Sequence, residues 1–311
     1  MEKFLCRFGV PAVARRVIDQ IVRPEEIAFV EALEAEGSFA APAANRALTT
    51  GTGKVVGGKE TDRFLREAYR RGILQLEDES FTRFRLGSFY GRLDIFAITE
   101  PDVYQALPRE QRAALDDWYF GAYLAGLAQT PRPSEDRVAL LSEALAFLDE
   151  ADAAGRKIWL NRCDCRTLAG HCGKPTDTCI SFRSGINTLS HRGWSKLITK
   201  EEAKEVLRRA NRAGLMQTVN PNGICNCCGD CCYLFRAQNA RNDRQWPAAG
   251  HIAGFDSKIC VSCGLCAKRC PFGAFSAADG VGFDPALCRG CGLCAETCPV
   301  GAIQMKRRAC L

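Results

Sequence analysis

Histidine and methionine are scarce in this 311-residue chain, which has three residues of each. With so little imidazole, a hydrolase built on histidine is not indicated. No apolar run approaches the roughly 20 residues that a membrane helix needs. The first residues also lack the basic head, long apolar stretch and small-residue cleavage site of a secretory signal. We therefore expect a cytoplasmic protein, whose thiols stay reduced.

Cysteine is almost absent from the first half of the chain and abundant in the second. Only Cys6 precedes residue 163, and the other 18 of the 19 cysteines lie at or after that position. Charge changes at a similar place: residues 1–155 carry net −6, residues 156–250 net +9 and residues 251–311 net +3. These shifts predict three domains with those bounds. In a reducing compartment, cysteines at this density indicate metal ligands and not disulfides.

The last domain contains an internal repeat with a period of 28 residues. Residues 258–274 and 286–302 each contain C-x2-C-x2-C-x3-C-P, with Gly264 and Gly292 at equivalent places. Three closely spaced thiolates can wrap one face of a 4Fe–4S cluster, and glycines with positive φ let the backbone fold over it. A pair of zinc ribbons would use two C-x2-C knuckles, which does not match these triplets.

These two motifs closely resemble bacterial two-cluster ferredoxins. The resemblance implies a pseudo-twofold domain of two short hairpins and two short helices, in which the fourth cysteine of each copy binds the other cluster. The implied ligands are Cys260, Cys263, Cys266 and Cys298 for the first 4Fe–4S cluster, and Cys270, Cys288, Cys291 and Cys294 for the second. This domain is net basic, whereas free ferredoxins are typically acidic, which argues against a small diffusing carrier.

Nine more cysteines lie in the middle domain, in two groups. They are Cys163, Cys165, Cys172 and Cys179, followed by Cys225, Cys227, Cys228, Cys231 and Cys232. A helix is predicted between the groups at Thr199–Gly214, because Thr199 and Glu202 form a capping-box signature. Strands are predicted at residues 157–160 and 215–219. Since neither group alone has a comfortable cubane spacing, we expect the fold to join them in a shared site.

The kind and number of these sites stay open. We expect one or two additional iron–sulfur clusters, because Arg162, Arg166 and Arg236 beside the cysteines would stabilise a cluster's negative charge. Zinc is the alternative, with His171 beside Cys172 as an extra ligand. The segment resembles iron–sulfur proteins of anaerobic bacteria and archaea that join C-x-C-R…C…P…C and C-N-C-C-x-x-C-C segments to a ferredoxin domain. That resemblance implies metal binding and anaerobic redox metabolism without naming a reaction.

The first domain shows no obvious chemistry. Predicted helices at residues 24–36 and 60–71, followed by strands at 73–77 and 81–88, suggest a winged-helix-like fold. Long helices are predicted at residues 108–128 and 134–152. The second helix carries Arg63, Arg66, Arg70 and Arg71. We favour a solvated face in which the first three pair with Glu60 and Glu67, because an acidic domain lacks the basic footprint that DNA binding needs.

The sequence therefore predicts a multidomain α+β protein: a helical, winged-helix-like domain, a cysteine-rich α+β domain and a two-cluster ferredoxin-like domain. Its predicted role is single-electron transfer through several 4Fe–4S clusters, as a non-catalytic component of an anaerobic oxidoreductase system. Expected partners are an acidic ferredoxin, a flavodoxin or a larger oxidoreductase subunit, with no nucleic acid. One alternative is an iron–sulfur enzyme with an irregular substrate-binding cluster at Cys225–Cys232; another is a redox-sensing DNA-binding regulator.

Overall fold

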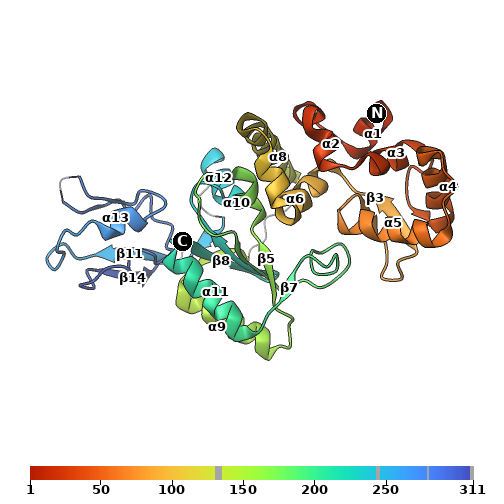
Figure 1. Ribbon diagram of the computed structural model, residues 1–311. Helices are drawn as coiled ribbons and strands as arrows, with labels where there is room; N and C mark the ends of the chain where they lie inside the picture. The colour runs from red at the N-terminus through yellow and green to blue at the C-terminus, as the bar shows by residue number, and fades with distance from the viewer. Residues whose placement is uncertain (130–134, 243–245, 279, 309–311) are drawn as a thin grey trace. The chain divides into compact units, whose positions relative to one another are not determined.

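The computed structural model describes residues 1–129, 135–242, 246–278 and 280–308 (Figure 1). Its mixture of helices and strands confirms the predicted α+β class. The chain forms two compact units. Unit 1 is Met1–Gly126 with Thr167–Ala169 and Ser184–Ser195, and unit 2 is Leu127–Arg166, Gly170–Arg183 and Lys196–Leu311. Within the described ranges, no helix has the length and apolar character needed to cross a membrane.

The boundary between the units lies earlier than the predicted boundary at residue 155. In place of a helix at 134–152, the structure has a strand, β4 (Arg137–Ala139), and then a helix, α9 (Leu141–Ala153); Ser134 lies outside the described residues. β4 pairs with a strand of unit 2, and α9 packs on the unit 2 sheet through Ala144 and Leu148. Unit 2 also contains most of the predicted cysteine-rich domain and the predicted ferredoxin-like domain.

Unit 1 is mainly helical. A three-stranded antiparallel sheet in the order β1-β3-β2 accompanies helices α3, α4 and α5. The helices predicted at 24–36, 60–71 and 108–128 and the two strands after residue 72 are present with slightly different ends. The elements are α1 (Glu2–Phe8), η1 (Ala12–Val17), α2 (Ile18–Ile21), α3 (Pro24–Ala32), β1 (Phe39–Ala40), α4 (Ala41–Thr52), α5 (Gly58–Arg70), β2 (Leu74–Leu76), β3 (Arg83–Leu86), α6 (Phe89–Thr99), α7 (Pro101–Ala106) and α8 (Arg109–Gln129).

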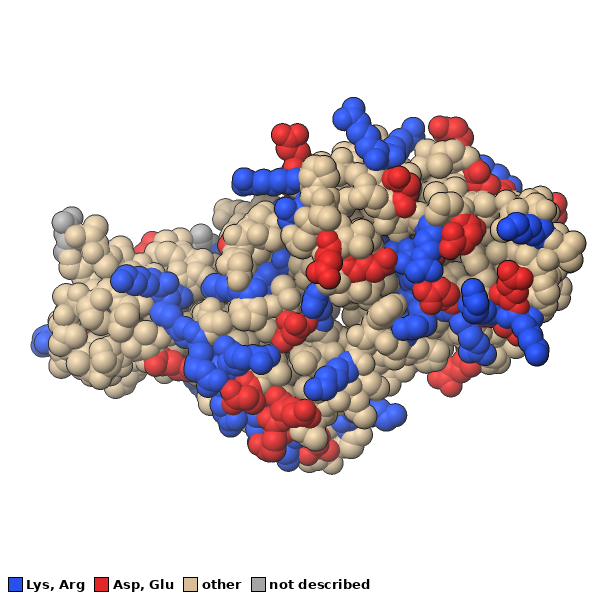
Figure 2. All heavy atoms as spheres, in the orientation of Figure 1, with Lys and Arg blue, Asp and Glu red and all other residues tan. Residues whose placement is uncertain are grey.

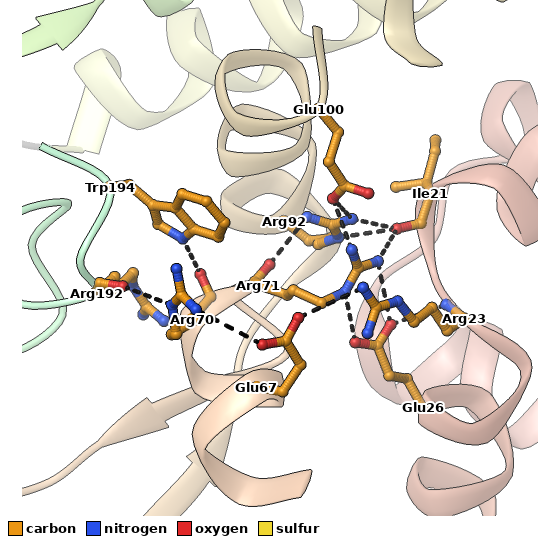
Figure 3. A network of polar contacts seen from close by, with 10 residues as sticks. All are labelled: Ile21, Arg23, Glu26, Glu67, Arg70, Arg71, Arg92, Glu100, Arg192 and Trp194. Atoms are coloured by element: carbon orange, nitrogen blue, oxygen red, sulfur yellow. Dashed lines mark hydrogen bonds and ion pairs between the residues drawn. The ribbon is translucent and has the colours of Figure 1, made fainter. Parts of the chain in front are cut away.

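A buried network of charged side chains joins the helices of unit 1 (Figure 3). The Arg92 guanidinium is fully buried and donates to the Ile21 carbonyl at 2.6 and 2.9 Å. It also pairs with Glu100 at 2.7 Å, and the buried Arg71 pairs with both Glu100 and Glu26 at 2.7 Å. Burial lowers the pKa of Arg92 to about 10. Arg71 therefore belongs to the interior of unit 1 and not to an exposed arginine face.

The segment Ser184–Ser195 leaves the sheet of unit 2 and packs within unit 1. The Asn187 side chain accepts a hydrogen bond from the Leu76 N–H and donates one to the Leu76 carbonyl, both at 2.9 Å. The Trp194 indole donates to the Arg70 carbonyl at 2.6 Å. This segment therefore adds to the edge of the β2–β3 hairpin and to the end of α5.

The predicted pairing of arginines along α5 is present only in part. Arg70 lies 4.0 Å from Glu67, as expected, but Glu67 also pairs with Arg23 at 3.4 Å. The Arg66 guanidinium instead lies over the Phe81 ring, 4.7 Å from its centroid. Figure 2 shows acidic and basic side chains interspersed over the visible face of unit 1. That face is therefore mixed in charge.

Unit 2 contains a seven-stranded sheet in the order β10-β4-β8-β9-β6-β5-β7. Neighbouring strands are antiparallel except β10 and β4. Helices α9 and α11 cover one face, where their apolar side chains pack against Ile180 and Ile224 (Figure 1). Besides β4 and α9, the elements are β5 (Trp159–Arg162), α10 (Asp164–Ala169), β6 (Asp177–Ser181), β7 (Lys196–Leu197), α11 (Lys200–Arg212), β8 (Met216–Asn220), β9 (Gly223–Cys227), α12 (Tyr233–Ala240) and β10 (Ala248–Ala249).

Helix α11 begins as its sequence predicts. The Thr199 hydroxyl accepts a hydrogen bond from the Glu202 N–H at 3.2 Å, and the Glu202 carboxylate accepts one from the Thr199 N–H at 2.8 Å. Gly214, at φ 78°, follows the end of the helix. The predicted strand at 215–219 is β8, and the one predicted at 157–160 is β5, which ends directly before Cys163.

The C-terminal part of unit 2 contains two small antiparallel pairs. Strand β11 (His251–Phe255) pairs with β14 (Ile303–Arg307), and β12 (Phe275–Ser276) pairs with β13 (Gly282–Phe283). The first sequence repeat forms one short helix, α13 (Leu265–Arg269).

The second predicted short helix is not found in the described residues, because residues 293–297 form consecutive turns. Most backbone N–H groups there bond three residues back, as from Thr297 to Cys294 and from Cys298 to Ala295. Among these described residues, only Glu296 bonds four residues back, to Gly292. In α13 the N–H groups bond four residues back, from Cys270 to Cys266, as an α-helix requires.

Candidate metal centres

Six cysteines gather on the face of the unit 2 sheet opposite α9 and α11. Cys179 lies in β6, and Cys225 and Cys227 lie two residues apart in β9, so their side chains share one face. The alternate residues Ile180 and Ile224 face the covering helices. Cys163 and Cys165 follow β5 at the start of α10, and Cys232 caps α12.

The sulfurs of these six cysteines form a closed ring of hydrogen-bonded neighbours, which we call the six-sulfur ring. The ring runs through Cys163, Cys165, Cys232, Cys227, Cys225 and Cys179 and returns to Cys163. Hydrogen bonds from flanking thiols lower the pKa of Cys163, Cys225 and Cys232. The same bonds raise the pKa of Cys165, Cys179 and Cys227, which act as the donors. The six sulfurs therefore lie close enough to interact directly, and thiols bind metal as thiolates.

One buried cation lies beside the ring. Arg166 is 3% exposed, and its guanidinium donates to the Pro175 and Asn226 carbonyls and to the Thr178 hydroxyl at 2.6 to 3.0 Å. Burial opposes its charge, but the negative charges of Cys163, Cys179 and Cys228 outweigh that effect and raise the pKa of Arg166. A fixed positive charge at this place stabilises anionic sulfur. Of the three arginines predicted beside the cysteines, Arg166 has this role most clearly.

The remaining three middle cysteines form a second group with Asp230, which we call the three-sulfur site. The ligand atoms of Cys172, Cys228, Cys231 and Asp230 all lie within 4.8 Å of one another. Cys228 and Cys231 are buried, Cys172 is half-buried and Asp230 is exposed. A hydrogen bond from Cys231 lowers the pKa of Cys228 to about 7. His171, predicted as an extra ligand, is not one of these ligand atoms.

Each group thus combines cysteines from before and after α11. The partition follows from two Cys-Cys dipeptides, since Cys227 and Cys232 face the ring while Cys228 and Cys231 face the three-sulfur site. Sequence reasoning missed both this partition and Asp230. The segment C-N-C-C-G-D-C-C offered one signal, the C-x2-C spacing of Cys228 and Cys231, which is typical of a separate metal knuckle.

The C-terminal cysteines surround a cavity. Cys270, from the first repeat, lines it together with Cys288, Cys291 and Cys294 of the second repeat. Backbone N–H groups of Ala274 and Gly290 donate to the sulfurs of Cys270 and Cys288 at 3.3 and 3.4 Å. Burial raises the pKa values of Cys291 and Cys294 to about 12. A thiol-lined hollow with N–H donors on its sulfurs has the chemistry that a 4Fe–4S cluster needs.

The other four C-terminal cysteines also come together. Burial raises the pKa of Cys266, and the nearby charges of Cys260 and Cys263 add to that effect. The Ser262 N–H donates to the Cys260 sulfur at 3.4 Å. Cys298 packs in the same apolar cluster as Cys266, which also contains Cys270, Cys288 and Cys294 of the other set. Both glycines expected to have positive φ do so, at 70° for Gly264 and 79° for Gly292.

The ring and the C-terminal cysteines share a buried apolar cluster. Cys227 and Cys232 of the ring pack there with Cys291, together with Met216, Val138, Phe235 and Leu293. A Cβ at Gly229 would lie only 2.5 Å from the Pro271 carbonyl, so the loop of the three-sulfur site also touches the ferredoxin-like part closely. These centres therefore belong to one packed body.

Comparison with known proteins identifies one family in part of the chain. A 4Fe–4S binding domain matches residues 253–276 and 281–304, which contain all eight cysteines of the two repeats. No match was found among curated proteins or solved structures. The C-terminal part is therefore a ferredoxin-like 4Fe–4S binding domain, which supports an iron–sulfur electron-transfer role. The comparisons contain no relative that bears on the resemblance of the whole chain to multidomain proteins of anaerobes.

Proposed function

We propose that this chain is an electron-transfer protein that passes single electrons through several 4Fe–4S clusters within an oxidoreductase system. The observation that carries the proposal is the packing of ring cysteines Cys227 and Cys232 against Cys291 of the ferredoxin-like part. When bound, 4Fe–4S clusters supply one-electron chemistry at potentials set by charge, hydrogen bonds to sulfur and solvent exposure. The proposed mechanism uses no acid, base or nucleophile from the chain.

The eight C-terminal cysteines would hold two clusters with crossed ligation. Cys270 lines the cavity of Cys288, Cys291 and Cys294, which supports assigning it to the second cluster. Cys260, Cys263, Cys266 and Cys298 would then hold the first. The N–H groups on the Cys270 and Cys288 sulfurs would stabilise added negative charge and so raise the potential of the second cluster.

The six-sulfur ring would hold an additional cluster next to the second one. Its sulfurs come from β6, β9 and the starts of α10 and α12, so regular elements hold them in place. Arg166 would neutralise part of the charge. Since Cys291 packs with Cys227 and Cys232, the second cluster would lie between the ring and the first cluster, whose ligand Cys263 is exposed. Electrons would then enter or leave at Cys263 and reach the ring last.

Spin coupling tests this order. Anaerobically purified full-length protein should contain more than about eight irons, and its reduced spectrum in electron paramagnetic resonance should show coupling between the ring and the second cluster. Cys291→Ala should remove the coupling, whereas the matched variant Cys263→Ala should leave it in place. Iron confined to the eight C-terminal cysteines, or a ring signal insensitive to Cys291→Ala, would contradict the proposed order.

An acidic redox protein is the partner we propose. The sequence from 156 to 311 is basic in both of its predicted parts, by +9 and +3. Figure 2 shows basic side chains gathered on unit 2 around the ends of α11 and α13. Arg269 there donates to the Arg212 carbonyl at the end of α11. Complementary charge speeds encounter and is screened by salt, so reduction by an acidic ferredoxin or flavodoxin should slow as salt rises. A rate independent of salt would exclude steering.

For unit 1 we propose a winged-helix-like arrangement that serves as an assembly surface. The order α3, β1, α4, α5, β2, β3, with β3 central in the sheet, supports this fold. The interspersed charges on its visible face support a protein partner over DNA. Deleting residues 1–126, the continuous part of unit 1, should leave electron transfer in solution unchanged and abolish it in the assembled complex. Binding to DNA that weakens steeply with salt would overturn this role.

A further inference from the structure

The three-sulfur site differs in scale from the cysteines of the ferredoxin-like part. Its four ligand atoms all lie within 4.8 Å of one another. Thiolates around one zinc ion, at about 2.3 Å from the metal, lie roughly 3.8 Å apart in a tetrahedron. A cubane spreads its thiolates farther, since each binds a different iron, and Cys270, Cys288, Cys291 and Cys294 correspondingly line a cavity. No other such close group of ligand atoms occurs among the residues that the structure describes.

The local chain is that of a zinc knuckle. Cys228 and Cys231 enclose Gly229 and Asp230 in a C-x2-C loop, the spacing typical of tetrahedral zinc sites. The Cys231 N–H donates to the Cys228 sulfur at 3.3 Å, which closes the loop around that sulfur. Gly229 is required because a Cβ there would lie 2.5 Å from the Pro271 carbonyl. Cys172, half-buried, supplies a third sulfur from a distant part of the sequence.

The fourth ligand position of the tetrahedron faces solvent and is occupied by a carboxylate oxygen. Asp230 is exposed, and its carboxylate accepts a hydrogen bond from the Cys231 N–H at 2.9 Å, which holds it over the loop. Three thiolates and a carboxylate around a divalent ion have a net charge of about −2. Arg166 is hydrogen-bonded to Cys228, and Lys174 lies near Asp230, so two cations balance this charge.

We infer that Cys172, Cys228 and Cys231 bind one tetrahedral divalent ion of the zinc class, with Asp230 as its fourth ligand, separately from the six-sulfur ring. The ion would fix the loop whose neighbouring residues, Cys227 and Cys232, belong to the ring. It would therefore position ring ligands without exchanging electrons. The inference concerns a different metal from the proposed electron-transfer centres and does not depend on them.

X-ray absorption at the zinc edge of the anaerobically purified full-length protein tests the site directly. We expect one zinc per chain, with three sulfurs at about 2.3 Å and one oxygen at about 2.1 Å. Iron and zinc contents are measured on the same sample. A low iron content would contradict the electron-transfer proposal, whereas a low zinc content would contradict this inference. Absence of zinc, or zinc with four sulfurs, would overturn the inference.

Matched variants separate the two sites. Cys172→Ser should remove the zinc and leave the iron content unchanged, whereas Cys165→Ser, in the ring, should lower the iron and leave the zinc. Asp230→Ala should keep the zinc but let a chelator remove it about tenfold faster. If Cys172→Ser removes about four irons, the three-sulfur site holds an iron–sulfur cluster and the inference is wrong. The wild-type absorption spectrum decides the question even if a variant fails to fold.

Discussion

The two units bury polar groups in opposite ways. In unit 1, the buried guanidiniums of Arg71 and Arg92 are balanced by the carboxylates of Glu26 and Glu100 at 2.7 Å. In unit 2, the six ring sulfurs interact mainly with one another, and one buried guanidinium, Arg166, lies beside them. In unit 1, side chains of the protein itself balance the buried charges. We propose that the arrangement in unit 2 becomes complete only when its sulfurs bind metal as thiolates.

This difference indicates which unit should depend on bound metal for its folding. Removing one partner of a buried ion pair is strongly destabilising, because it leaves an uncompensated buried charge. Adjacent thiolates without metal repel one another, so metal binding contributes directly to folding free energy. We therefore expect unit 1 to be stable without added ligands and the sheet of unit 2 to depend on its metals.

Removing all metals is the strongest way to separate the units. Anaerobic chelation of the full-length protein should destabilise unit 2 by more than about 5 kcal/mol, the size of a whole domain's stability. Hydrogen exchange should then show lost protection in β8 and α11 and retained protection in α6. Equal protection of β8 before and after metal removal would contradict the expected dependence.

Neutralising one carboxylate tests the completeness of the unit 1 network. Glu100→Gln leaves Arg71 and Arg92 with a single carboxylate between them, Glu26, and should cost about 3 kcal/mol. The control is Glu67→Gln, which breaks exposed pairs with Arg23 and Arg70 and should cost less than about 1 kcal/mol. Urea unfolding followed by hydrogen exchange in α6 measures both. Similar costs for the two variants would show that burial does not strengthen the network.

Acid should weaken unit 1 through the same carboxylate. Burial raises the pKa of Glu100, but the positive charge of Arg92 and the hydrogen bonds from Arg92 and Arg71 outweigh this and lower it. Its stabilisation is therefore full above the unfolded pKa of about 4.3 and is lost as pH falls through the lower folded pKa. The free energy of unfolding of unit 1 should fall below about pH 4.3, and Glu100→Gln should flatten this decline. An unchanged slope in the variant would assign the acid sensitivity elsewhere.

The smallest expected effect concerns the cap of α11. Thr199→Ala removes the hydroxyl that accepts from the Glu202 N–H and should destabilise unit 2 by about 1 kcal/mol. Thr52→Ala, at the exposed last turn of α4, removes a hydroxyl that does not cap the start of a helix. It should lower the free energy of unfolding by less than about 0.5 kcal/mol. Measured with metals bound, protection should fall in α11 and stay constant in α6. A loss in both units would mean that they unfold together.

Local signals predicted much of the fold correctly. The capping box at Thr199, the helices α3, α5, α8 and α11, and the β2–β3 hairpin are all present near their predicted positions. The helix predicted over 134–152 was partly wrong, since residues 137–139 form β4, which lies between β10 and β8 in the sheet. The partner strand β8 lies about eighty residues later in the sequence. The pairing of distant strands has no local sequence signal, so the sequence did not predict that β4 and α9 belong to unit 2.

The sequence by itself determined that this protein binds 4Fe–4S clusters, because the spacing of cysteines within each repeat is local and matches the coordination of one cluster. Only the tertiary structure decided how the nine middle cysteines divide. The sheet places β5, β6 and β9 side by side, and the chain bends directly after β9, so that Cys227 interacts with the ring and Cys228 with the three-sulfur site. It also decided that ring cysteines pack with Cys291, because burial of apolar surface joins segments that the sequence separates.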